Sequence, residues 1–147
     1  MPADSGQPRK IEDRYLDGTS LRLRRVEDSA AVVFKLGQKI RADPSDPSLV
    51  HATNLYLTAE EHQRLSVLPA AVLVKTRWLV GRFAVDEFGG PLRGLLLAEI
   101  ELAETDLAGL EDLPITLPRW LGREVTHDDR YSGATLARVG RPPSGQG

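Results

Sequence analysis

Pairs of positively charged side chains separated by one residue recur along this chain. Arg22 and Arg24 alternate with leucines in the segment LRLR, and Lys75 and Arg77 are separated by one residue in the segment VKTR. Positions two apart on a β-strand face the same side, so each strand would present two neighbouring cations. Lys35, in FKLGQK, would add a cation on a third strand. Guanidinium and ammonium groups match phosphate oxygens, so this clustering predicts a site for a polyphosphate.

A pair of carboxylates repeats the same spacing. Glu99 and Glu101 alternate with Ile100 and Leu102. Two carboxylates on one face suit a hard cation such as Mg²⁺ or Mn²⁺. The plain alternative is a half-solvated sheet with mixed surface charge. Because like charges two apart repel, surface strands usually intersperse the two signs, so three same-sign pairs favour a charged cavity.

Alternating and apolar runs predict a chain made mostly of strands. Asp17-Gly18-Thr19 is typical of a hairpin turn, and Gly81 marks another. Many antiparallel strands with two or three helices predict an α+β domain built on an antiparallel β-barrel. The expected strands cover residues 11–16, 20–27, 31–40, 50–57, 72–80, 82–88, 94–103 and 122–126.

Capping signals predict the helices. Thr58 with Glu61 forms a capping box for a helix that ends before Pro69, and Asp128 or Asp129 is expected to cap a last helix through about Ala137. A short helix is expected at 104–111. Proline-containing irregular connections are expected at 42–48 and 112–118.

The net charge and the composition of the chain limit its possible functions. The formal net charge of −2 gives no sign of a nucleic-acid polymer as partner. The sequence has no cysteine and no apolar run near the ~20 residues that cross a membrane. A cytoplasmic protein without membrane contact is the expectation. We expect one domain over residues 10–138, with flexible ends at 1–9 and 139–147.

The charged strands resemble those of the CYTH domain, also called the triphosphate tunnel metalloenzyme family. The likeness covers roughly residues 10–137, and the order and spacing of its motifs are fairly specific. That family includes inorganic triphosphatases, thiamine triphosphatases and class IV adenylate cyclases, and its fold is an eight-stranded antiparallel tunnel. The matching segments read IEDRYLDGTSLRLRR, FKLGQK, LVKTRW, VDEFGGPLRGLLLAEIEL and WLGREVTHDDRYS.

The resemblance implies a role for each matching residue. A Mg²⁺ or Mn²⁺ ion would position a water for attack on the terminal phosphorus, with Glu99, Glu101 and Lys75 as the catalytic groups. Phosphate contacts are implied for Arg22, Arg24, Lys35, Lys75 and Arg77, and metal binding for Glu99, Glu101 and Asp86. Since no residue clearly reads a base, inorganic triphosphate is the favoured substrate over a nucleotide.

One departure from the family pattern matters. The family opens with an ExExK strand, and residues 1–10 contain none; IEDRYL matches the family's second strand. Either the natural chain starts upstream, or this protein lacks part of the metal site. An incomplete barrel exposes strand edges, which favours pairing with a second copy. The alternatives to a triphosphatase are therefore a non-catalytic polyphosphate or nucleotide binder, or an enzyme of the cyclase or thiamine triphosphatase type.

Overall fold

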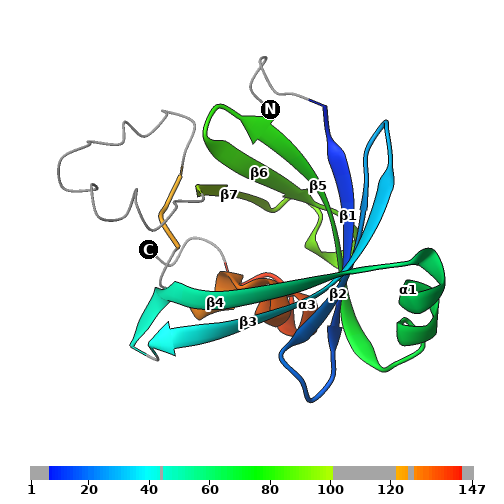
Figure 1. The fold of residues 1–147 in the computed structure, drawn as a ribbon. Helices are drawn as coiled ribbons and strands as arrows, with labels where there is room; N and C mark the ends of the chain where they lie inside the picture. The colour runs from blue at the N-terminus through cyan, green and yellow to red at the C-terminus, as the bar shows by residue number, and fades with distance from the viewer. Residues whose placement is uncertain (1–6, 44, 101–121, 126–127, 144–147) are drawn as a thin grey trace.

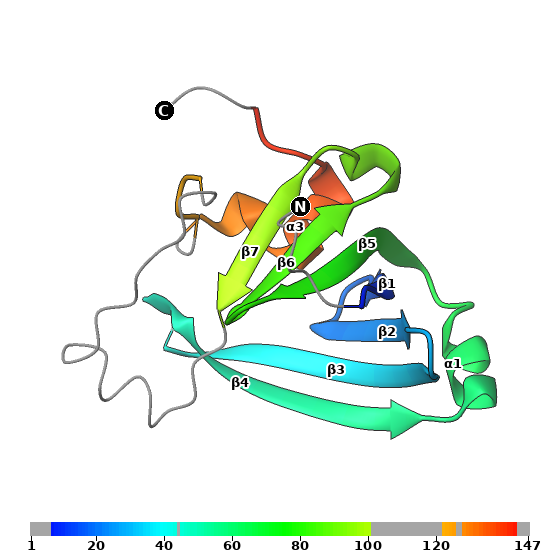
Figure 2. The ribbon, with the colours of Figure 1, turned by 90° about the horizontal axis from the view of Figure 1, so that it is seen from above.

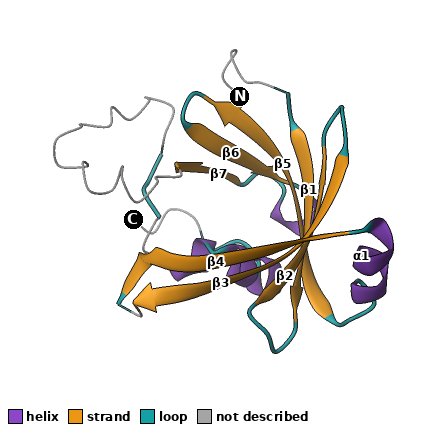
Figure 3. Cartoon of the chain, in the orientation of Figure 1, coloured by secondary structure: helices purple, strands orange, loops and turns teal. Residues whose placement is uncertain are grey.

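Seven antiparallel strands form a single sheet in the computed structural model, which describes residues 7–43, 45–100, 122–125 and 128–143. The order across the sheet is β4-β3-β2-β1-β5-β6-β7 (Figures 1 and 3). The strands are β1 (Arg9–Leu16), β2 (Leu21–Glu27), β3 (Val32–Asp43), β4 (Asp46–Leu57), β5 (Ala70–Val80), β6 (Phe83–Phe88) and β7 (Leu96–Ile100).

The sheet curves strongly, so that its two arms turn toward the same side (Figures 1 and 2). β1, β2 and β5 lie at the middle of the curve, while β3–β4 and β6–β7 form the arms. Among the described strands, β4 and β7 are the two edges and do not pair with each other. The predicted antiparallel, tunnel-like α+β fold is confirmed, as an open seven-stranded sheet in these residues.

Tight turns connect neighbouring strands as the sequence predicted. At the β1–β2 turn, Gly18 has a φ of 73°, a left-handed conformation that glycine adopts without steric cost. The Thr19 hydroxyl donates a hydrogen bond to the Leu16 carbonyl over 2.9 Å and fixes the turn. Gly81, with a φ of 58°, makes the corresponding turn between β5 and β6.

The helix α1 (Ala59–Leu65) begins at the predicted capping box. The Thr58 hydroxyl accepts a hydrogen bond from the Glu61 amide over 3.1 Å, and the Glu61 carboxylate accepts one from the Thr58 amide over 2.8 Å. His62 of this helix is buried, with its ring 4.7 Å from that of Phe34 on β3. The helix α1 therefore covers one end of the sheet, on the face that carries Phe34.

Apolar side chains form two separate clusters. One lies inside the curve, where Leu136 of the C-terminal helix α3 (Gly133–Val139) packs with Leu73 and Phe88, together with Leu92 from η1 (Gly90–Leu92). The other lies on the opposite face and combines Val80, Phe83 and Val85. Trp78 packs against this second cluster.

Several sequence predictions at the loops were wrong. Within the predicted loop 42–48, residues 42–43 and 46–48 are strand instead, because β3 runs to Asp43 and β4 starts at Asp46. Pro47 is tolerated because β4 is an edge strand in the described sheet, where proline's missing donor can face away from the ladder. The strand predicted at 122–126 is also wrong, since 122–125 have no regular structure.

The C-terminal helix starts later than predicted. Asp128 caps the short 3-10 helix η2 (Asp129–Tyr131), whose backbone turns tightly before Ser132 caps α3. The elements predicted at 104–111 and 112–118 lie outside the described residues. No helix in the described part of the chain is long and apolar enough to span a membrane.

Candidate functional site

Strand register brings the predicted cations to one face of the sheet. Directly paired residues of an antiparallel ladder point to the same side, and Asp13 pairs with Arg24, which in turn pairs with Lys35. Arg77 pairs with Asp86. We call this side the inner face; it is the side on which α3 packs. Of the predicted site residues it carries Arg22, Arg24, Lys35, Lys75, Arg77, Asp86 and Glu99.

On β1 and β2, a fully buried aspartate faces the arginine pair. Arg24 donates from Nε and Nη2 to the two Asp13 oxygens over 2.6 and 2.7 Å. The Nε of Arg22 lies 3.9 Å from the same carboxylate, and it is buried without a hydrogen-bond partner in the described residues. Burial, followed by the charge of Arg24, lowers the pKa of Arg22. Burial also opposes ionisation of Arg24, but the bonds to Asp13 outweigh it and raise that pKa.

The strands β5 and β6 repeat this arrangement. Arg77 donates from Nε and Nη2 to the two Asp86 oxygens over 2.7 and 2.9 Å, and Lys75 Nζ lies 2.9 Å from Asp86 Oδ2. Burial would raise the pKa of Asp86, but Arg77 and Lys75 lower it overall. The hydrogen bond to Asp86 raises the pKa of Arg77. Burial lowers the pKa of Lys75, whose side chain is only 7% exposed.

These two groups form one electrostatic unit with an excess of positive charge. Arg77 lowers the pKa of both Arg22 and Arg24, and Asp13 raises that of Lys75. Two aspartates thus face four largely buried cations, which leaves a net charge of +2 before Lys35 is counted. A buried excess of this kind is favourable only when an anion compensates it.

Lys35 lies beside this unit. Its Nζ is 5.3 Å from the ring centroid of Tyr56 on β4, close enough for a cation–π contact. Because Lys35 pairs directly with Arg24, it extends the row of cations toward the β4 arm.

Two inner-face residues were missed or left aside by the sequence reasoning. Asp13 received no role, although its alternation with Ile11 and Tyr15 is a signal that it shares their face. Tyr15 is next to the site and packs against the cluster around Leu136. Burial, followed by the negative charge of Asp13, raises the pKa of the Tyr15 phenol to about 12. Tyr15 therefore stays neutral and forms the boundary between the charged site and the apolar cluster.

The carboxylates predicted to bind metal are in different situations. Both oxygens of Asp86 are held by cations, whereas Glu99 on β7 is exposed and contributes to the electrostatics of Arg77. Glu101 lies outside the described residues. Within the described ranges, no group of three or more His, Cys, Asp or Glu side chains is arranged to hold a metal ion. The described side chains alone therefore do not make a metal site.

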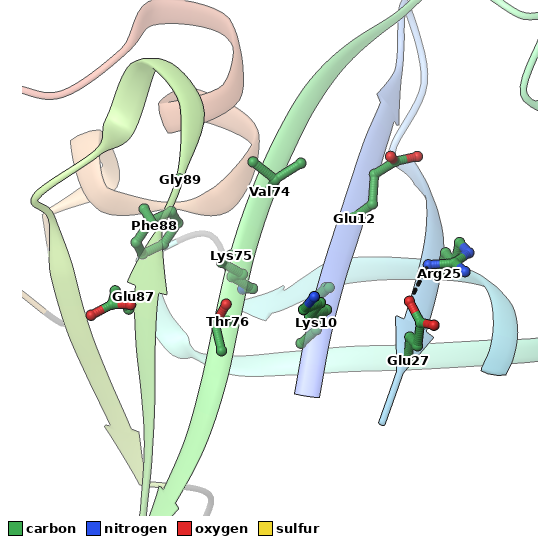
Figure 4. Close-up of a pocket in the computed structure, with 11 residues that line it drawn as sticks. Lys10, Glu12, Arg25, Glu27, Val74, Lys75, Thr76, Glu87, Phe88 and Gly89 are labelled. Atoms are coloured by element: carbon green, nitrogen blue, oxygen red, sulfur yellow. Dashed lines mark hydrogen bonds and ion pairs between the residues drawn. The ribbon is translucent and has the colours of Figure 1, made fainter. Parts of the chain in front are cut away.

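A depression of about 300 Å³ lies mainly on the opposite, outer face (Figure 4). Its charges are mixed, and the Arg25–Glu27 ion pair on its wall is already neutral. A polyanion would find no excess of positive charge there, so this depression is a poor alternative to the inner face. The outer-face side chains around it are Lys10, Glu12, Arg25, Glu27, Val74, Thr76 and Glu87.

Comparison with known proteins identifies a relative with a similar sequence. The chain is 44% identical over 54 residues to an inorganic triphosphatase of Acetivibrio thermocellus. The match covers 37% of this chain and 31% of that protein, so it spans about a third of the relative's length. No family model matches the sequence.

Solved structures resemble the whole fold. The hypothetical protein NE1496 is 21% identical with a TM-score of 0.58, over 97% of this chain and 92% of its own. A second structure, of the inorganic triphosphatase NE1496, has a TM-score of 0.55 and 21% sequence identity. The match covers 93% of this chain and 89% of that one. The PH1819 protein from Pyrococcus horikoshii OT3 has a TM-score of 0.52 and 17% sequence identity. The match covers 74% of this chain and 71% of that one. This chain therefore shares the fold of these solved structures, one of which is an inorganic triphosphatase.

Proposed function

We propose that the protein binds a triphosphate on the inner face and hydrolyses it with the help of a divalent cation, with inorganic triphosphate as the favoured substrate. The observation that carries the proposal is the buried excess of cations, four against two aspartates, on adjoining strands. A triphosphate supplies several closely spaced negative charges, which this excess requires. The local sequence similarity to an inorganic triphosphatase of Acetivibrio thermocellus supports the same substrate class.

Each cation has a defined task in this proposal. Arg22, whose Nε lacks a hydrogen-bond partner in the described residues, would bind phosphate oxygens directly. Arg24 and Arg77 would bind through the guanidinium N–H groups that face away from their aspartates. Lys75 and Lys35 would neutralise charge on the transferring and leaving phosphates. Preorganised cations in a largely buried site stabilise the charge that develops in phosphoryl transfer.

The dependence on Mg²⁺ or Mn²⁺ is a separate part of the proposal. Such an ion would neutralise phosphate charge and activate a water when bound. Of the three predicted metal ligands, Glu101 lies outside the described residues and Asp86 is bonded to cations. Glu99 is described, and no cation in the described part of the chain bonds its oxygens. We propose that Glu99 and Glu101 together hold the ion. Asp86 is not assigned to the ion, because both of its oxygens are bonded to cations.

Titration calorimetry with inorganic triphosphate in EDTA tests the binding step. Arg22→Ala should raise the dissociation constant by roughly 10- to 100-fold, because a hydrogen bond to a charged group contributes about 1.5–3 kcal/mol. The matched control is Arg25→Ala, which removes an arginine from the outer face of the same strand. If both variants bound like the wild type, the inner face would not be the site.

Phosphate release from inorganic triphosphate tests the chemical step. We expect turnover with Mg²⁺ or Mn²⁺ and its loss in Glu99→Gln, while binding of triphosphate in EDTA persists in that variant. The second candidate, a non-catalytic polyphosphate binder, is favoured by the absence of a three-carboxylate cluster in the described residues. Tight binding without phosphate release under any divalent cation would decide for this binder and against the enzyme.

A further inference from the structure

Each of the two cation pairs has its own buried aspartate on the neighbouring strand. Asp13 on β1 faces Arg22 and Arg24 of β2, and Asp86 on β6 faces the pair on β5. The two units have the same bonding, with Nε to Oδ1 and Nη2 to Oδ2 of a directly paired arginine. Across the strand order β2-β1-β5-β6, the buried charges of the inner face therefore alternate between cations and aspartates.

This bonding fixes each guanidinium group in one orientation. The arginine fork has five N–H groups, and the bonds to aspartate use one on Nε and one on Nη2. Three remain, on Nη1 and Nη2, and the planar fork directs them away from the carboxylate. Because the aspartates are only 0–1% exposed, a ligand on the inner face reaches the arginines and not the carboxylates.

We propose that Asp13 and Asp86 are positioning residues for the triphosphate, and that Asp86 does this in place of binding metal. The inference rests on the proposed function and deepens it. Each aspartate holds one arginine in its binding orientation and limits the repulsion between two cations on the same strand. The triphosphate then meets preformed donors, so less side-chain freedom is lost on binding.

Asp13→Asn and Asp86→Asn separate positioning from simple charge. Either substitution removes one negative charge, so a site governed by net charge alone would bind triphosphate more tightly. Positioning predicts the opposite, a dissociation constant raised about tenfold or more in EDTA. Glu27→Gln is the matched control, because it removes the carboxylate of an arginine pair on the outer face and should leave binding unchanged.

The absence of metal in this assay distinguishes the two roles of Asp86. If Asp86 only bound metal, Asp86→Asn would weaken the response to Mg²⁺ and leave binding in EDTA unchanged or tighter. That result, or tighter binding by Asp13→Asn, would overturn the proposal. Wild-type protein that fails to bind triphosphate at all would instead refute the proposed function.

A measurement on the wild type keeps the test independent of whether the variants fold. NMR signals of the arginine Nε–H groups, assigned by through-bond experiments on the wild type, report their exchange with water. We expect the signals of Arg24 and Arg77 to be protected both without ligand and with triphosphate, relative to that of the partly exposed Arg25. Exchange of all three at equal rates in the free protein would contradict preformed donors.

Discussion

Replacing Arg77 by glutamine should destabilise the fold through the carboxylate that it leaves behind. Asp86 is 1% exposed and would lose two charge-assisted hydrogen bonds of 2.7 and 2.9 Å, keeping only Lys75. Removing one partner of a buried pair costs about 3–5 kcal/mol. Because the Arg77 side chain is 21% exposed, water recovers part of this, and we expect a loss of about 2–3 kcal/mol.

Acid should remove this difference between variant and wild type. The wild-type fold holds the pKa of Asp86 below its usual range, with Arg77 and Lys75 outweighing the effect of burial. A lowered carboxylate pKa stabilises the fold above the unfolded-state pKa of about 4, and this stabilisation is lost as pH falls through the folded-state pKa. The difference in unfolding free energy should therefore be constant between about pH 5 and 7 and shrink below about pH 4.

Urea unfolding across this pH range measures the effect. Arg25→Gln is the matched control, since its ion pair with Glu27 is 37% and 43% exposed and should contribute only about 0–1 kcal/mol. Equal losses in the two variants, or an Arg77→Gln penalty that does not change on acidification, would refute the assignment of Asp86 to a buried pair.

Three further predictions concern the surroundings of the charged site. Absorbance titration should show one tyrosine near pH 12 that is absent in Tyr15→Phe, and because the folded-state pKa is raised, stability should fall as pH increases from about 10 toward 12. Gly37→Ala should weaken triphosphate binding, measured by calorimetry, because the added Cβ would lie 2.9 Å from Asn54 Oδ1 and 3.2 Å from Arg22 Nη2 and would displace these side chains. Gly122→Ala is its control, because the added Cβ meets no described atom within 4 Å. Gly133→Ala should lower stability by about 1–3 kcal/mol in urea unfolding, because the new methyl meets the Tyr15 ring.

Alternation in the sequence was sufficient to assign side chains to faces. Once a strand is recognised, its period of two puts Arg22 and Arg24 on one face, and likewise Lys75 and Arg77. This assignment does not depend on the tertiary structure. The capping box at Thr58 and the turn at Gly18 were predictable for the same reason, since both depend on residues close in sequence. Local rules thus identified most of the elements and predicted which described cations share the inner face.

Pairing between strands was not predictable in this way. That Asp13 lies opposite Arg24, and Asp86 opposite Arg77, depends on register across the sheet, which period alone does not determine. Asp13 was overlooked because Glu12 beside it is also acidic, so composition gave no sign of which one faces inward. The prediction for 42–48 failed for a different reason: its composition is typical of loops, although Asp43 ends one strand and Asp46 and Pro47 begin the next.

The buried cations and aspartates alternate from strand to strand on the inner face, and this explains how the charged face can exist before a ligand binds. Four cations buried together without counter-charge would lower one another's pKa and oppose folding, as burial already does for Lys75 and Arg22. The aspartates offset half of this charge while occupying only the inward N–H groups of Arg24 and Arg77. The uncompensated half is then available to a polyanion. A site with more aspartates would fold more easily but bind triphosphate less tightly, and one with fewer would have the opposite balance.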